Sequence, residues 1–250
     1  ENIPVLGGFF RLVTVRQYNY SDENHDAEIE LAQITYGEDG EGTPVGEVAV
    51  GAAAPDNADV GNAEGAGQEA GVAKLSEEGV QEINQDMETT VDELIRQFED
   101  TLSEEGYHGL HVSQEVVTDN AQYYTVKLSA LETEASGYEH NQFYTIDKQT
   151  GNVVALADLF AEGSDYISVI SENIKTQMRE QMVADEGVIY FLDDEDMPEF
   201  NFQSITEQTN FYFNESGELV IAFDEYEVAP GYMGAPEFVI PQKVTAGLLK

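Results

Sequence analysis

Apolar residues along this chain follow two different periods, and each period predicts its own kind of element. Between residues 80 and 102 they recur every three or four positions, the spacing of one stripe on an amphipathic α-helix. Ser76 is a suitable N-cap, and Gly106 lies just beyond the expected end. A second helix is predicted to start near Ser164–Asp165. The two stripes are Val80, Ile83, Met87, Val91, Leu94, Ile95, Phe98 and Leu102, then Tyr166, Ile167, Ile170, Ile174, Met178 and Met182.

Alternating segments rich in β-branched and aromatic residues fill most of the remaining chain and predict strands. Residues 3–20 and 27–34 are expected to form a hairpin around the turn at 21–26. Further strands are expected at 110–117, 121–132, 140–147, 152–156, 187–192, 199–205, 209–214, 218–228 and 237–241. Because strands outnumber helices and their links are short, we expect an α+β fold. Its sheet would be largely antiparallel, with the two amphipathic helices packed on one face.

Residues 37–71 follow neither period. They consist mainly of Gly, Ala and acids, without an aromatic or a basic residue. Such a composition buries too little apolar surface to offset its ordering entropy, so we interpret the segment as an elaborated loop. We expect two closely associated subdomains: residues 1–107, with residues 37–74 as an acidic insertion, and residues 108–250.

The charge of the chain narrows its possible partners. It has 50 acidic and 10 basic residues in 250, for a formal net charge of -40. Nucleic acids and anionic membrane surfaces carry charge of the same sign and are repelled, whereas cationic proteins are attracted. A high acid content also keeps an extracellular protein soluble, and this alternative explains the charge equally well on its own. The chain begins at Glu1 rather than Met, which favours a sequence trimmed at its N-terminus, where a signal peptide would stand.

Two polar clusters have features of metal sites, and neither is complete. Asp22, Asn24 and Asp26 have calcium-loop spacing, but Ala27 stands where the loop needs glycine and Gln33 where it needs glutamate. His108 and His111 could place two imidazoles near one metal. Zinc needs two further ligands that the sequence does not supply, so we favour solvated or core histidines. We expect no metal and no cofactor.

Motifs for catalysis are missing. The chain has no cysteine, no Gly-x-Ser-x-Gly elbow, no His-Glu-x-x-His and no phosphate-binding glycine loop between a strand and a helix. The acidic run at 193–199 is interpreted as a solvated loop. Sequence spacing does not reveal whether two of the many carboxylates lie close enough for glycoside hydrolysis. The expectation is therefore a protein that is not an enzyme.

The segment FDEYEVAPGYMGAPEFVIP, residues 223–241, contains the most unusual loop. Tyr232 and Met233 lie between Gly231 and Gly234, after the stiffening Pro230. Loop tips usually carry small polar residues, so a large aromatic one suggests either contact with a partner or a ring that folds back onto the sheet edge. The first alternative would supply an anchor of the kind that dominates protein interfaces.

Two stretches of the second half resemble a known family. TGNVVALADLFAEGSDYISVISENIKTQM (150–178) and TNFYFNESGELVIAFDEYEVAPGYMGAPEFVIP (209–241) are similar to the C-terminal domain of RsiV-type anti-sigma factors. The N-terminal half is similar to the smaller domain that precedes it, also found with polysaccharide deacetylases. Its opening, IPVLGGFFRLVTVRQY, resembles the segment just outside the membrane helix. The long insertion departs from the family pattern.

The resemblance implies the extracellular domain of a single-pass membrane protein of Gram-positive bacteria. In such proteins a cytoplasmic segment, absent from this chain, holds a sigma factor inactive, and a membrane helix, also absent, anchors the outer part. The outer part binds lysozyme, and binding permits proteolysis that frees the sigma factor in a stress response. Lysozyme or another cationic protein is therefore the expected partner here.

The expected partner-binding residues lie in two segments. The first is the loop just described, and the second is the 136–141 loop, which we expect at an edge of the same surface. They comprise Tyr226, Pro230, Gly231, Tyr232, Met233 and Gly234, with Ser136, Gly137, Tyr138 and His140. Two alternatives to the sensor remain: an accessory domain of a secreted polysaccharide deacetylase, and a free-standing lysozyme inhibitor whose loop would plug the cleft of the enzyme.

Overall fold

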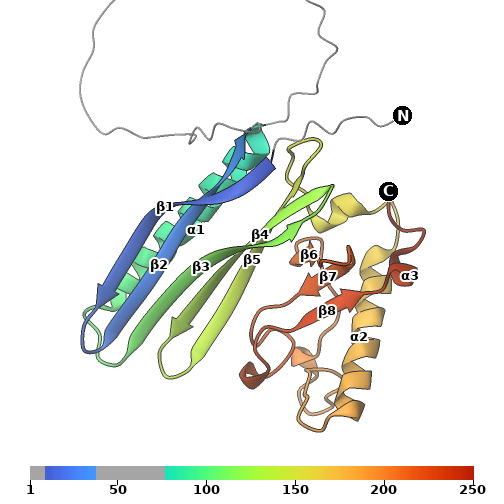
Figure 1. The fold of residues 1–250 in the computed structure, drawn as a ribbon. Coiled ribbons are helices and arrows are strands. Elements are labelled where there is room, and N and C mark those ends of the chain that lie inside the picture. Colours follow the sequence, from blue (N-terminus) through green and yellow to red (C-terminus); the bar gives the residue numbers. More distant parts are fainter. Residues whose placement is uncertain (1–8, 38–76) are drawn as a thin grey trace, which may run out of the picture.

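The computed structural model describes residues 9–37 and 77–250 (Figure 1). The predictions for the first residues of the chain, for the Ser76 cap and for most of the 37–74 insertion lie outside these residues. Strands β1 (Phe9–Ser21) and β2 (His25–Gly37) pair antiparallel over their whole length, which confirms the N-terminal hairpin.

Helix α1 (Glu77–Thr101) follows the predicted apolar stripe. Side chains at three- and four-residue steps are buried against one face of the sheet, among them Ile83, Met87, Val91 and Phe98. Figure 1 shows the helix lying across the β1–β2 side of that sheet. Gly106, just after the helix, has a φ of 119°, a backbone conformation that L side chains rarely adopt.

Five strands form the larger sheet, in the order β1-β2-β3-β4-β5. Strands β3 (His108–Asp119), β4 (Tyr123–Thr133) and β5 (Gly137–Asp147) are antiparallel neighbours. Strands β2 and β3 are parallel, because the chain crosses between them through α1. Their pairing covers only His25–Ile29 against His108–Val112.

The second half builds a separate small sheet. Strands β6 (Phe211–Phe213), β7 (Leu219–Ala222) and β8 (Glu237–Ile240) pair antiparallel, and α2 (Tyr166–Ala184) packs against them. Short helical turns complete it: η1 (Leu156–Leu159), η2 (Pro198–Phe200), η3 (Gly231–Met233) and α3 (Gln242–Thr245). The α+β class and the two main amphipathic helices are thus confirmed, but the strands divide between two sheets and each sheet has its own helix (Figure 1).

Three predicted strands are wrong. Residues 187–192 and 199–205 lack regular strand structure, and in 152–156 only Val153 makes an isolated bridge, to Ile146. In 187–192 the alternate side chains Tyr190 and Leu192 are buried, and in 199–205 Phe202 and Ile205, three positions apart, are buried; all four belong to the hydrophobic core of the second half. Burial of alternate side chains does not require a strand ladder.

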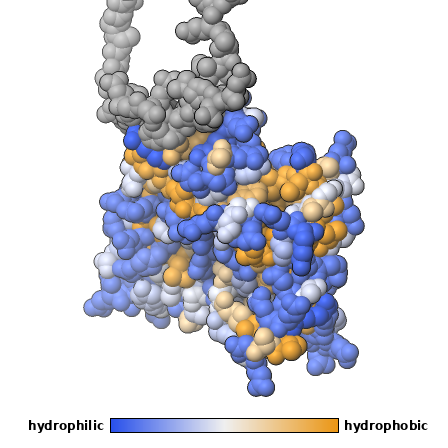
Figure 2. All heavy atoms as spheres, turned by 45° about the vertical axis from the view of Figure 1, so that its right-hand side comes forward, coloured by the Kyte–Doolittle hydropathy of each residue, from blue (hydrophilic) through white to orange (hydrophobic). Residues whose placement is uncertain are grey.

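The two halves meet through aromatic pairs. Tyr123 stacks on Phe213 and Phe143 on Tyr212, with ring centroids 4.7 and 5.4 Å apart. The hydroxyl of Thr118 donates to the Phe213 carbonyl oxygen and accepts from its N–H. The buried residues of the first hydrophobic core lie between Phe10 and Ile146, and those of the second lie between Leu156 and Ile240, so the two cores separate after β5. The predicted domain boundary after residue 107 stays a prediction. Figure 2 shows a largely hydrophilic surface interrupted by smaller hydrophobic areas.

Candidate functional site

The two segments predicted to bind a partner lie next to each other. The rings of Tyr138, on β5, and Tyr226, after β7, have centroids 6.3 Å apart. Backbone hydrogen bonding fixes this contact: the Glu225 N–H donates to the Glu139 carbonyl oxygen (3.1 Å), and the Glu139 N–H donates to the Glu225 carboxylate (2.8 Å). Residues 224 and 225 thereby cover the free edge of β5 at Glu139 and Asn141.

The backbone of this segment is held in an uncommon shape. Tyr226 has a φ of 68°, in the left-handed region that non-glycine residues rarely occupy. Its ring packs directly on Gly231, where an added Cβ would lie 2.3 Å from the ring. Gly234, with a φ of 65°, ends the η3 turn that Pro230 precedes. Only glycine therefore fits at position 231 without moving the tyrosine.

Tyr232 and Met233 face different surroundings. Tyr232 is 66% exposed, and its hydroxyl donates to the Gly187 carbonyl oxygen (3.0 Å). Met233 packs against the second core. The Tyr232 ring therefore lies outside the hydrophobic core, and the hydrogen bond of its hydroxyl to Gly187 holds its position. In the 136–141 segment, Ser136 accepts from the Glu134 N–H through its carbonyl oxygen, and Gly137 begins β5.

Carboxylates surround the Tyr138–Tyr226 pair. Burial raises the pKa of Asp224 and of Glu227 above their ordinary values. Asp224 accepts from the Asn141 N–H (2.8 Å), and Glu227 accepts from the Asp224 N–H (2.9 Å). The pKa of Tyr138 is also raised, mainly by burial and then by the nearby charges of Asp224, Glu132, Glu227 and Glu225.

We call this region the acidic aromatic surface: Tyr138, His140, Asp224, Glu225, Tyr226, Glu227 and the Pro230–Gly234 segment. Sequence reasoning found its aromatic residues but did not assign roles to the carboxylates. The acids at 224–227 adjoin the predicted loop, which was the available signal. Glu132 gave no such signal, because only its cross-strand pairing with Tyr138 brings it here.

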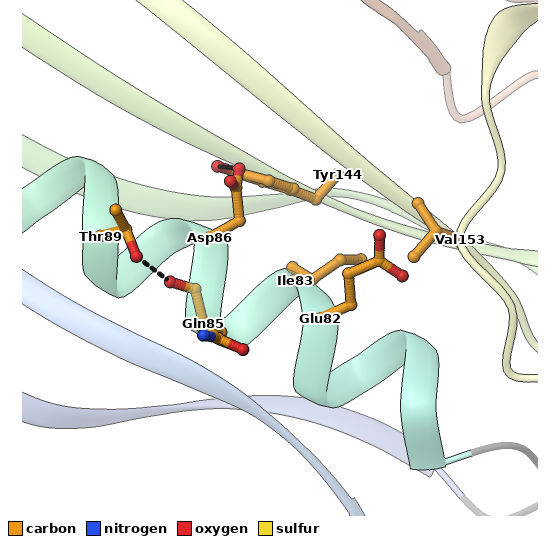
Figure 3. Close-up of a pocket in the computed structure, with 7 residues that line it drawn as sticks. All are labelled: Glu82, Ile83, Gln85, Asp86, Thr89, Tyr144 and Val153. Carbon is orange, nitrogen blue, oxygen red and sulfur yellow. Dashed lines mark hydrogen bonds between the residues drawn. The ribbon is translucent and has the colours of Figure 1, made fainter.

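A different hollow lies between α1 and β5 (Figure 3). It has a volume of about 440 Å³ and is lined by Glu82, Ile83, Gln85, Asp86, Thr89, Tyr144 and Val153. Asp86 already accepts from the Tyr144 hydroxyl (2.9 Å) and from the Gln142 amide (3.1 Å). The pKa of Tyr144 is raised by burial and by Asp86, so this hydroxyl stays protonated and is a poor acid. We assign no chemistry to the hollow.

The two metal-like clusters have other partners. The Asp22 carboxylate accepts from the N–H groups of Asn24 and His25 and lies 3.0 Å from the His25 ring, which makes it part of a tight turn. His108 and His111 are three apart on one strand, so their rings lie on opposite faces. Within 9–37 and 77–250, no group of three or more His, Asp or Glu side chains has an arrangement that could hold a metal ion.

No helix in the described residues is both long and apolar enough to cross a membrane.

Comparison with known proteins gives three results. Residues 157–243 match the family model described as a protein of unknown function, DUF3298. The chain is 39% identical over 176 residues to the anti-sigma-V factor RsiV of Bacillus subtilis (strain 168). That match covers 66% of this chain and 61% of RsiV, so the chain spans less than two thirds of that relative.

The third result concerns solved structures. A DUF3298 family protein of Pseudomonas aeruginosa PAO1 has a TM-score of 0.59 at 16% identity, covering 97% of this chain and 94% of that one. A DUF3298 member from Bacteroides fragilis has a TM-score of 0.49 at 13% identity, covering 98% and 95%. The first likeness supports the α+β fold. The resemblance seen in the sequence is thereby confirmed: residues 157–243 match the DUF3298 model, and the chain is similar to the anti-sigma factor RsiV.

Proposed function

We propose that this chain is the extracellular sensor domain of a membrane-anchored anti-sigma factor, and that it binds lysozyme or another cationic protein. The observation that carries the proposal is the exposed Tyr232 ring on the acidic aromatic surface. An exposed aromatic ring on a constrained segment loses little conformational entropy on binding, which suits it as an interface anchor.

Charge supports a cationic partner. With a formal net charge of -40, the chain attracts basic proteins over distances of about a Debye length, ~8 Å at physiological salt. Such attraction mainly raises the association rate, whereas specificity comes from the desolvated contacts. We therefore expect the acids to speed encounter and the Tyr232 segment to determine which basic protein stays bound.

Signalling would require parts of the protein that lie outside this chain. In the proposed scheme, ligand binding permits proteolysis of the anti-sigma factor and release of its sigma factor. The role of this chain is then recognition, with no catalytic step of its own. The relationship to RsiV supports this scheme.

Binding of a basic lysozyme by calorimetric titration tests the recognition step. Tyr232→Ala should weaken binding by ~2 kcal/mol or more, about thirtyfold, because the ring would be the buried anchor. Phe200→Ala is the control: Phe200 is 60% exposed and lies in η2, outside the acidic aromatic surface. Equal affinities of the two variants would remove the Tyr232 segment from the proposal.

A cellular test addresses the sensor role. Replacing the matching part of RsiV by this chain should give a sigma-dependent reporter that responds to added lysozyme. The Tyr232→Ala chimera should respond only at higher lysozyme concentrations. A chimera that binds lysozyme without reporter activation would favour an inhibitor over a sensor.

A further inference from the structure

A small cavity lies where the last turns of α1 meet the start of β3 and the end of β4. Its volume is about 200 Å³. A cavity of roughly 150 Å³ holds a benzene molecule, whereas sites for drug-sized ligands start at ~300 Å³. The cavity therefore has room for the end of one side chain, and too little for an organic cofactor.

The lining of the cavity is apolar at its base and acidic at its rim. Leu94, Phe98 and Leu110 are buried side chains of the first core. Glu132 and Glu134 come from the end of β4 and the turn after it. The residues that line the cavity include no lysine and no arginine. This combination suits a group with an apolar stem and a cationic end.

Helix α1 adds negative potential at the same place. Thr101, its last residue, lines the cavity, and the last turn of Glu77–Thr101 contains no basic residue. The carbonyl end of a helix carries a partial negative charge that cations stabilise. The Thr101 carbonyl oxygen accepts from the Glu104 N–H (2.8 Å) and lies 3.1 Å from Nε2 of His25, and the lining residues add no lysine or arginine to this charge.

One buried ring nitrogen beside the cavity lacks a hydrogen-bond partner. His108 lines the cavity and is 8% exposed, and its Nδ1 has no hydrogen-bond partner. The closest carboxylate oxygen of Glu134 is 3.7 Å away, beyond hydrogen-bond reach. Stacking on His25, with centroids 5.5 Å apart and planes 10° apart, fixes the ring. In its Nε2-protonated form, His108 presents Nδ1 as an acceptor.

Glu132 connects the cavity to the acidic aromatic surface. It pairs with Tyr138 across β4 and β5, and its carboxylate lies 3.6 Å from Nδ1 of His140, which also lacks a hydrogen-bond partner. Strand alternation places Glu132, Tyr138 and His140 on the face of the sheet that α1 covers. A partner that contacts the exposed Tyr138 ring can therefore also reach the cavity that Glu132 lines.

We propose that this cavity binds the guanidinium group of an arginine side chain from the cationic partner, an inference that rests on the proposed function. Glu132 and Glu134 accept its charged hydrogen bonds, and Nδ1 of His108 accepts one more. A guanidinium presents five N–H donors in a planar fork, which suits several acceptors around one space. The aliphatic stem lies against Leu94 and Phe98.

Methylguanidinium tests the cavity without any protein partner. Titrated into the chain, it should shift the His108 ring resonances in NMR spectra in a saturable way, with resonances assigned by comparison with His108→Gln. Glu132→Gln/Glu134→Gln should abolish saturation. The control Glu78→Gln/Glu88→Gln removes the same charge from α1 and should behave as the unaltered chain does. The proposal would be overturned if the His108 chemical shifts did not saturate with methylguanidinium, or if they changed equally in the two double variants.

Lysozyme titrations at constant ionic strength test the site in a complex. Glu132→Gln/Glu134→Gln should weaken binding at least about tenfold more than Glu78→Gln/Glu88→Gln. If Tyr232→Ala weakens binding while the two double variants bind equally, the arginine site is wrong and the proposed function stands. If the unaltered chain binds no lysozyme, the proposed function fails, and the methylguanidinium titration still decides whether the cavity is a guanidinium site.

Discussion

Gly231 shows how a single position determines the shape of the binding segment. The Tyr226 ring occupies the space that a Cβ at 231 would need, and Tyr226 itself has a left-handed backbone. The two features depend on each other, because the ring can lie there only if residue 231 has no side chain. A glycine between apolar runs signals a turn in the sequence, but the contact that requires it is visible only in the fold.

Gly231→Ala should therefore destabilise the chain. Moving the Tyr226 ring out of the way would cost ~1–3 kcal/mol, the usual range for forcing extra atoms into a packed site. The free energy of unfolding measured in urea gives this difference. Gly187→Ala is the control, because its new Cβ would meet only the end of the Asp185 side chain. A Gly231→Ala variant as stable as this control would show that the ring moves freely.

At the scale of elements, side chains bond to the backbone of β2 where its pairing with β3 has ended. The parallel pairing ends at Ile29, and further along Asn84 of α1 accepts from the Ile34 N–H (2.7 Å) and donates to its carbonyl oxygen (2.9 Å). Gln114 of β3 accepts from the Ala32 N–H (2.6 Å). These amides satisfy backbone groups that a neighbouring strand would otherwise pair, and buried groups of this kind are rarely left without partners.

Asn84→Ala should leave both backbone groups of Ile34 without their partner and lower the free energy of unfolding by ~1–3 kcal/mol. Hydrogen exchange of the Ile34 amide should accelerate in the variant. Asn173→Ala, which removes an amide on α2 that accepts from Gln177, serves as the comparison and should have a smaller effect. Unchanged exchange at Ile34 would mean that water replaces the side chain at no cost.

For the whole molecule, the excess of acids dominates the electrostatics. The fifty acidic side chains repel one another, and the ten basic side chains are too few to cancel this repulsion. Local ion pairs such as Arg16–Asp92 offset part of it. The carboxyls of Asp224 and Glu227 have pKa values that partial loss of solvent contact raises above their ordinary values. Because their folded pKa lies above the unfolded value, their contribution to stability is present at low pH and lost as the pH rises through the folded pKa.

The chain should therefore become more stable as the pH falls from 8 toward about 5, and as salt is added at pH 7. Below about pH 4 the trend should reverse, because Asp22 has a pKa lowered first by the Asn24 N–H and then by His25 and Tyr20. Below that pH the unfolded chain takes up a proton at Asp22 that the folded chain does not, so the free energy of unfolding falls. Urea unfolding across pH 3–8 at two salt concentrations measures this, and a stability that rises steadily with pH would contradict it.

The sequence by itself determined the elements whose signals are local. Helices α1 and α2, the N-terminal hairpin and the glycine-bounded segment around Tyr232 each follow from periodicity or turn chemistry within a few dozen residues. Periodicity reports which side chains are buried, and it cannot report what they are buried against. That is why the irregular segments at 187–192 and 199–205 had the sequence pattern of strands.

Only the tertiary structure decided which distant residues share a surface. The parallel β2–β3 pair, the separation into two sheets and the contact of Tyr138 with Tyr226 depend on pairings between residues far apart in the chain. The acidic cavity beside His108 likewise joins α1, β3 and β4. Such pairings are set by the packing free energy of the whole molecule, which no local pattern in the sequence contains.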